Sequence, residues 1–194
     1  VAAGPGSFTG LRIGSATAKG LGLALNKPII SVPTLEGIAC NFYGTDAIIC
    51  PMMDARRNQV YTGVYRFEQE FETVMEPCMM DTRELARELN KYGERVILLG
   101  DGVPVNAQIL KENLEVPFSF APAQCSRQRG ASVAVLGAVY FTEGKTETAM
   151  EHKPDYLRKA QAERELEEAK RQGKVAELAA GHSVGDGSQR EGKA

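Results

Sequence analysis

The chain has 194 residues, enough for one large or two small domains with a proper core, and its net charge is −2 at pH 7. This balance excludes the large basic excess by which a protein follows nucleic-acid phosphates on its own, so we expect another subunit to hold any RNA. No apolar run approaches the ~18 residues of a membrane span and no secretory signal opens the sequence, which predicts a cytoplasmic protein without a membrane contact.

The first 45 residues alternate between strand and helix patterns. Residues 1–3 read as the end of a buried strand, and a helix begins near Phe8 after a glycine-rich turn. Residues 27–33 form a short apolar strand ended by proline, and Thr34 is expected to cap a helix to about residue 41. The order is strand, helix, strand, helix.

The order changes after residue 46. The expected elements are strands at 47–54, 59–67 and 71–77, a helix capped by Asp81 or Thr82, a strand over 95–102, a helix at 104–113, a strand at 117–121 and a long helix at 131–142. Three strands followed by helix, strand, helix, strand and helix is the order of a ribonuclease-H-like half-domain. The earlier residues match the second portion of the same unit, which predicts an α/β fold of two such lobes.

The predicted domains follow from this order. Residues 1–45 are assigned to the remainder of a first lobe whose beginning is missing, and residues 46–160 to a complete second lobe. Residues 161–194 are assigned to a charged helix and a tail of glycine, serine and charge, which is too polar to bury a core and is expected to be disordered.

The opening turn has two interpretations. Gly4, Gly6 and Gly10 surround Ser7 and Thr9, either of which can cap the following helix. A glycine loop at a helix N-terminus suits a phosphate, but it also serves as an ordinary strand-to-helix turn. Neither the dinucleotide fingerprint nor the P-loop triplet is present. A nucleophilic role for Ser7 is disfavoured because Pro5 occupies the first glycine position of the Gly-x-Ser-x-Gly pattern.

The first helix carries two stripes of different texture. Small residues recur every four positions at Gly10, Gly14, Ala18 and Gly22, and Ile13, Thr17, Leu21 and Ala24 form an apolar stripe beside them. One of these stripes is enough to pack the helix on its own sheet. The second stripe therefore needs another partner, and we predict that this partner is another subunit. The residues expected at that interface are Phe8, Arg12, Ile13, Gly14, Thr17, Ala18 and Leu21.

Cysteines and histidines argue against a metal site. The four cysteines are widely separated and are expected to be buried free thiols: Cys40, Cys50, Cys78 and Cys125. The two histidines, His152 and His182, lie near the end, which argues against a histidine-based metal site or triad in the core. We therefore expect neither catalytic residues nor metal ligands.

Two later motifs keep alternatives open. Asp54, followed by Arg56 and Arg57, orients a ligand, closes a salt bridge across the cleft between the lobes, or forms a structural pair within its own hairpin, which is the favoured interpretation. The second glycine turn, Gly100, Asp101 and Gly102, is either a nucleotide loop or an ordinary turn.

The chain resembles the TsaB (YeaZ) family along residues 1 to about 165. The resemblance is carried by the Gly-Pro-Gly-Ser-Phe-Thr-Gly-Leu-Arg-Ile-Gly run at 4–14, Asp-Ala-Arg-Arg-x-x-Val-Tyr at 54–61, Gly-Asp-Gly at 100–102, and Pro-x-Tyr-Leu-Arg at 154–158 followed by Gln-Ala-Glu at 161–163. It implies a two-lobe fold of the actin, sugar-kinase and chaperone ATPase superfamily. In that fold, residues 153–158 bring the chain back across the lobe junction, with Tyr156 and Leu157 as packing anchors and Arg158 facing the partner.

The resemblance also implies a role. Family members are companions of a catalytic paralogue, TsaD, and of the ATPase TsaE in making N6-threonylcarbamoyladenosine beside the tRNA anticodon. This chain would then be a non-catalytic scaffold that pairs with TsaD or with a second copy of itself, touches tRNA only indirectly and binds no cofactor. ATP and a metal ion are expected in the partner subunits. The alternative is a nucleotide-binding ATPase or kinase-like enzyme that uses the two glycine loops.

The resemblance predicts a missing beginning. Family members carry an initial segment of roughly 65 residues, the usual size of three strands plus a helix. Without it, apolar surface of the first helix is uncovered, so we expect this chain to be a fragment that is poorly soluble unless associated.

Overall fold

The computed structural model describes residues 1–67 and 70–155, which fall in one compact unit, Val1–Leu157. The strands are β1 (Ala2–Gly4), β2 (Val32–Pro33), β3 (Ile48–Arg56), β4 (Gln59–Phe67), β5 (Phe71–Asp81), β6 (Val96–Leu99) and β7 (Phe118–Phe120). The helices are α1 (Phe8–Leu25), α2 (Thr34–Ala39), α3 (Thr82–Tyr92), α4 (Gly102–Asn113) and α5 (Gly130–Thr142), with short 3-10 turns η1 (Cys40–Phe42) and η2 (Ala123–Cys125). Among these described helices, none has the length and apolar character needed to cross a bilayer.

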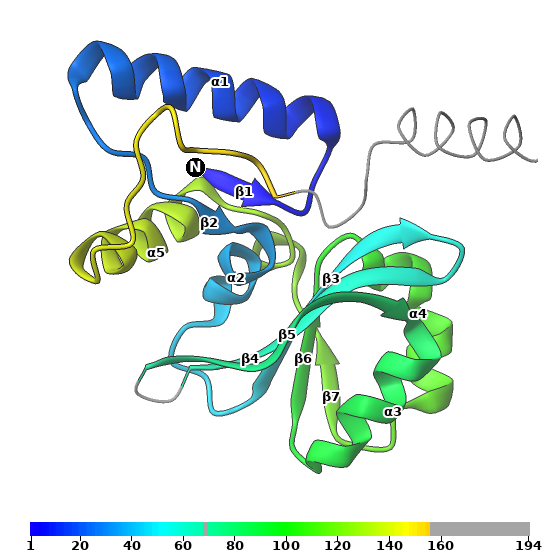
Figure 1. Cartoon of the computed structure of the whole chain (residues 1–194). Helices are drawn as coiled ribbons and strands as arrows, with labels where there is room; N and C mark the ends of the chain where they lie inside the picture. The colour runs from blue at the N-terminus through cyan, green and yellow to red at the C-terminus, as the bar shows by residue number, and fades with distance from the viewer. Residues whose placement is uncertain (68–69, 156–194) are drawn as a thin grey trace, which may run out of the picture. The chain divides into compact units, whose positions relative to one another are not determined.

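Within the described residues, the larger sheet has five strands in the order β5-β4-β3-β6-β7. β3, β4 and β5 pair antiparallel, while β6 and β7 continue the sheet in parallel with β3. The mixed α/β architecture and the element order expected after residue 46 are therefore confirmed (Figure 1).

Helices cover both faces of this sheet. Side chains alternate along β3, so Ile48, Cys50 and Met52 face α3 and α4, while Ile49 and Met53 face α2 and α5. Each face carries its own apolar core, and the central strand is buried on both sides. The predicted domain boundary between residues 45 and 46 stays a prediction. Helix α2, which precedes that boundary, packs on the larger sheet.

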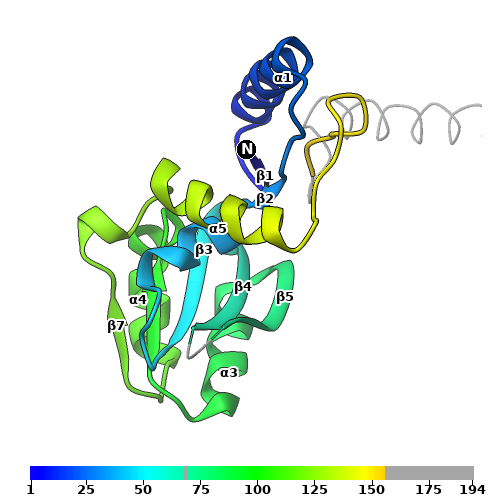
Figure 2. The ribbon, with the colours of Figure 1, turned by 90° about the vertical axis from the view of Figure 1, so that its left-hand side faces the viewer.

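The smaller sheet joins β1 to β2 in parallel, and α1 lies beside it, at the opposite end of the unit from α3 (Figure 2). The segment after α5 returns to this sheet. Ile29 and Glu147 exchange two backbone hydrogen bonds of 2.8 and 2.9 Å, and the Asp155 amide donates to the Ala3 carbonyl at 2.7 Å. The chain therefore crosses back to its own first strand.

Several predicted boundaries are corrected. The strand expected at 27–33 is limited to Val32–Pro33, because Ile29 pairs with Glu147 instead. Thr34 is the first residue of α2 rather than its cap, and its buried hydroxyl has no hydrogen-bond partner within the described residues. β5 extends to Asp81, beyond the expected residue 77, where the Asp81 side chain caps α3 by accepting from the Arg83 amide.

The predictions for the end of the chain lie outside the described residues. They concern Tyr156, Leu157, Arg158, the helix at 160–180 and the tail with His182.

Candidate functional site

The first turn of α1 is organised by Ser7. Its hydroxyl accepts a hydrogen bond from the Gly10 amide at 3.3 Å, which confirms Ser7 as the cap, while Thr9 is exposed. Gly4 has a φ of +134°, and a Cβ there would lie 2.1 Å from the Asp155 carbonyl oxygen. Close backbone packing therefore requires the glycine at position 4, independently of any phosphate.

The two stripes of α1 point in different directions. On the small-residue side, Gly22 lies so close to the turn before β2 that a Cβ would be 3.1 Å from the Lys27 carbonyl oxygen, and Gly14 faces Val1. On the other side, Ile13 and Leu21 are 63% and 58% exposed. The small-residue side thus packs within the chain, whereas the larger apolar side chains are left mostly exposed.

The other residues predicted at the interface make contacts within α1 or line a groove beside it. Arg12 stacks over the Phe8 ring, with its guanidinium carbon 3.9 Å from the ring centroid. The Thr17 hydroxyl donates to the Ile13 carbonyl, and Ala18 lines a groove beside the helix. The structure places these residues along one helix, and whether they meet a partner stays a prediction.

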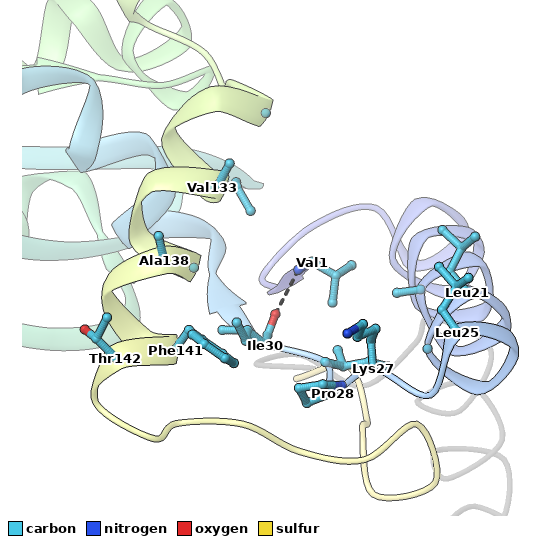
Figure 3. A pocket seen from close by; sticks show the side chains of 16 residues that line it. Val1, Leu21, Leu25, Lys27, Pro28, Ile30, Val133, Ala138, Phe141 and Thr142 are labelled. Carbon is cyan, nitrogen blue, oxygen red and sulfur yellow. Dashed lines mark hydrogen bonds between the residues drawn. The ribbon is translucent and has the colours of Figure 1, made fainter.

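The groove beside α1 has a volume of about 740 Å³. Figure 3 shows Leu21 and Leu25 of α1 across from Val133, Ala138 and Phe141 of α5. Val1 and the segment before β2, with Pro28 and Ile30, lie between the two helices. Almost all of its lining side chains are apolar, so the groove can bury apolar groups but offers few partners for a polar ligand. The sequence analysis found the α1 wall of this groove but not the α5 wall, because only the folded chain brings the two helices together.

The second glycine loop fits against the end of β3. Gly100 has a φ of +107°, and a Cβ would meet the Met52 carbonyl oxygen at 2.1 Å. Gly102, which begins α4, is 3.1 Å from the same oxygen by the same measure. Asp101 accepts a hydrogen bond from the Asp54 amide at 3.1 Å. These contacts supply a structural reason for each residue of the Gly-Asp-Gly turn.

The Asp54 carboxylate is occupied within its own hairpin. It accepts a hydrogen bond from the Arg56 amide at 2.8 Å, and the Arg56 guanidinium lies 3.4 Å from it. The favoured interpretation, a structural pair within the β3–β4 hairpin, is therefore confirmed, and the alternative of a salt bridge across a lobe cleft is not what this carboxylate forms with Arg56.

A histidine cluster was missed by the sequence analysis. His152 is only 1% exposed; its Nδ1 lies 2.9 Å from a Glu147 carboxylate oxygen and 3.0 Å from the Ser31 hydroxyl, which itself donates to Glu147. The position of the two histidines near the end of the chain did not predict this burial. The expectation that no histidine-based metal site or triad lies in the core stays a prediction. The three residues do not form a relay, because serine and glutamate meet the same ring nitrogen and Nε2 has no partner within the described residues. The cluster ties the segment after α5 to the beginning of β2.

The cysteines are free thiols, as expected, but only Cys40 and Cys50 are buried, while Cys78 and Cys125 are half-buried. Burial raises the pKa of the Cys50 thiol to about 12, which keeps it protonated at neutral pH. Within residues 1–67 and 70–155, no cluster of three or more metal-ligating side chains occurs.

One carboxylate between α2 and α5 predicts a pH effect on stability. Burial raises the pKa of Glu36 above its ordinary value of 4.5, although the Tyr140 hydroxyl donates a hydrogen bond to it. The folded state therefore binds the Glu36 proton more tightly than the unfolded state does. As a result, the contribution of Glu36 to the free energy of unfolding falls as the pH rises through and above 4.5.

We expect Glu36→Gln, which keeps an acceptor for Tyr140, to stabilise the protein at pH 7 by at most about 1 kcal/mol, since partial exposure screens the charge. The gain should shrink towards pH 4. Thermal unfolding at both pH values measures it, and an equal gain at pH 4 and pH 7 would contradict the assignment.

The pattern of the family described as "TsaD: tRNA N6-adenosine threonylcarbamoyltransferase" matches residues 1–166. A Bacillus subtilis protein, "tRNA threonylcarbamoyladenosine biosynthesis protein TsaB", is 36% identical over 84% of this chain and 70% of its own length. The protein of that name from Escherichia coli is 29% identical over 80% of this chain and 68% of its own length.

Solved structures are similar in fold. A Pseudomonas aeruginosa protein described as similar to the peptidase YeaZ superposes with a TM-score of 0.66 at 24% identity, covering 81% of this chain and 71% of its own. A structure of YeaZ from the same species gives 0.64 at 23% identity, covering 80% and 72%.

Proposed function

Because the chain belongs to the TsaB family, within the wider TsaD domain family, we propose that it is a non-catalytic scaffold and dimerisation subunit. The curated relatives are named for tRNA threonylcarbamoyladenosine biosynthesis, and this chain takes part in the same process. Its role would be to support TsaD in the complex that installs N6-threonylcarbamoyladenosine next to the anticodon.

The exposed apolar side of α1 carries this proposal. Three large apolar side chains, Ile13, Leu21 and Leu25, are 58 to 64% exposed on this side of the helix, and the groove against α5 adjoins them. An apolar surface of this kind marks a protein-binding site, because each Å² removed from water contributes about 25 cal/mol. The proposed contact is a helix of TsaD, or α1 of a second copy, packed on this surface.

The rest of the assignment follows from this role. ATP and a metal ion would act in TsaD and TsaE rather than in this chain, and the complex would work in the cytoplasm. The proposed fold is the two-lobed arrangement of the actin, sugar-kinase and chaperone ATPases, with residues 1–45 in the first lobe and residues 46–160 as the second lobe. The nucleotide-binding alternative gains no support from the glycine loops, since packing accounts for Gly4 and Gly100.

We expect Ile13→Glu/Leu21→Glu to abolish a complex with TsaD from the same organism. Both side chains are exposed, so the free chain should fold normally, whereas two buried carboxylates without partners would weaken the complex by at least about 3 kcal/mol. These positions are preferable to Gly14, which faces Val1 within the chain. Size-exclusion chromatography with light scattering measures assembly.

The matched control is Val105→Glu, which changes a 65% exposed apolar side chain on α4. It should leave assembly intact. If the double variant binds TsaD as well as this control does, the interface does not lie on α1. If the unchanged chain binds neither TsaD nor itself, the scaffold role is wrong.

A further inference from the structure

Two distant segments near the carboxyl end of the central strand carry arginines, and Asp54 and Asp101 connect Arg56 of one segment to Arg127 of the other. Arg56 and Arg57 lie at the turn after β3, and Arg127 and Arg129 lie in the loop between η2 and α5. All four are exposed; the side chains of Arg56 and Arg127 are 86% and 60% accessible. The scaffold role does not use these residues.

Hydrogen bonds and ion pairs join the two segments. The Asp54 amide donates to Asp101 at 3.1 Å, and Asp101 in turn lies 3.7 Å from the Arg127 guanidinium. On the other side, the Asp54 carboxylate pairs with Arg56. The loop is also held to this edge because the Ser126 hydroxyl accepts from the Gly100 amide at 3.2 Å.

The turn that carries Arg56 and Arg57 has a backbone conformation of high free energy for residues other than glycine. Arg56, Arg57 and Asn58 have φ values of 70°, 56° and 59°, a conformation that costs ~1 kcal/mol or more for each residue with a Cβ. Glycine fits such hairpin positions better. The conformation is secured by Asp54, which accepts from the Arg56 amide, and by Thr82, whose amide donates to the Asn58 carbonyl at 2.9 Å. Arginine thus stands where glycine would adopt the backbone conformation more easily, which points to a use for the guanidinium groups.

The charges at this edge favour an anionic ligand. Four guanidinium groups accompany the carboxylates of Asp54 and Asp101, which leaves two positive charges in excess among these six groups on a chain whose net charge is −2. A guanidinium has five N–H donors, and one carboxylate contact leaves most of them available for phosphate oxygens.

We propose that Arg56, Arg57, Arg127 and Arg129 bind the phosphate backbone of an RNA. This inference rests on the proposed function, which makes that RNA the tRNA to be modified. It departs from the expectation that tRNA is reached only through another subunit. RNA is preferred to an acidic protein because the process in which the chain takes part acts on tRNA.

The test measures the anisotropy of a fluorescein-labelled tRNA against the full chain, alone and mixed with TsaD, at several salt concentrations. The variant is Arg56→Gly/Arg57→Gly/Arg127→Gln, in which glycine relieves the positive φ values so that the fold is kept. The matched control, Arg83→Gln/Arg87→Gln/Lys111→Gln, removes three exposed positive charges from α3 and α4.

We expect the variant to weaken tRNA binding at least tenfold and to lower the slope of log K against log salt by up to about 3, while the control has a much smaller effect. Equal tRNA affinity and slope for variant and control would overturn the inference. So would a variant that loses TsaD but keeps tRNA, which would assign the surface to a protein, or release of tRNA by millimolar ATP, which would assign it to a nucleotide.

Failure of the scaffold role is a separate outcome. If the scaffold role fails, size-exclusion chromatography shows no complex with TsaD. The RNA inference is tested separately, by whether the arginine variant weakens tRNA binding to the chain in the anisotropy measurement. No binding of tRNA by the unchanged chain, alone and with TsaD, would also overturn it.

Discussion

Gly100→Ala should destabilise the protein by about 3 kcal/mol or more. The added Cβ would lie 2.1 Å from the Met52 carbonyl oxygen, and the residue would keep a φ of +107° that side chains with a Cβ rarely adopt. Relief requires β3 and the beginning of α4 to move apart, and both are packed in the same core. Overpacking and backbone strain each contribute on the order of 1–3 kcal/mol. Urea unfolding followed by circular dichroism measures the loss.

The matched control is Gly20→Ala within α1. A Cβ at Gly20 has no neighbour within 4 Å among the described residues, so alanine should raise the stability of the helix by up to about 1 kcal/mol. A Gly100 variant as stable as this control would contradict the close packing of Gly100 against the Met52 carbonyl oxygen.

Asn106→Leu should cost about 2–3 kcal/mol although it adds an apolar side chain to an apolar core. Asn106 is 1% exposed; its amide donates to the Gly102 carbonyl at 2.8 Å, and its carbonyl oxygen accepts from the Thr82 hydroxyl at 2.9 Å. The change leaves the buried Gly102 carbonyl without that donor and introduces a side chain of different shape. Chemical denaturation measures the loss of unfolding free energy.

The comparison variant is Gln108→Leu on the same helix. Gln108 is exposed and its amide contacts Glu112, so its replacement should change stability by less than about 0.5 kcal/mol. If both variants cost the same, the buried amide network between α3 and α4 contributes no more than a surface hydrogen bond.

Local patterns predicted most elements correctly. The apolar strands β3 and β6, the cap at Asp81 and the α1 helix with its Ser7 cap depend on neighbouring residues in the chain, and their signals are periodicity, capping and turn chemistry. The predicted interface on α1 also came from such a pattern. What the pattern could not decide was which stripe faces outward, because a row of small residues fits either a partner or the chain's own turn.

The sequence by itself determined the α/β class, the order of the elements after residue 46 and the family to which the chain belongs. Only the tertiary structure decided what depends on contacts between distant residues. His152 was buried against Ser31 and Glu147, Asp54 was occupied within its own hairpin, and the segment after α5 returned to β1. The physical reason is that turns, caps and periodicity act over a few residues, whereas burial and close approach are set by elements that meet only once the chain has folded.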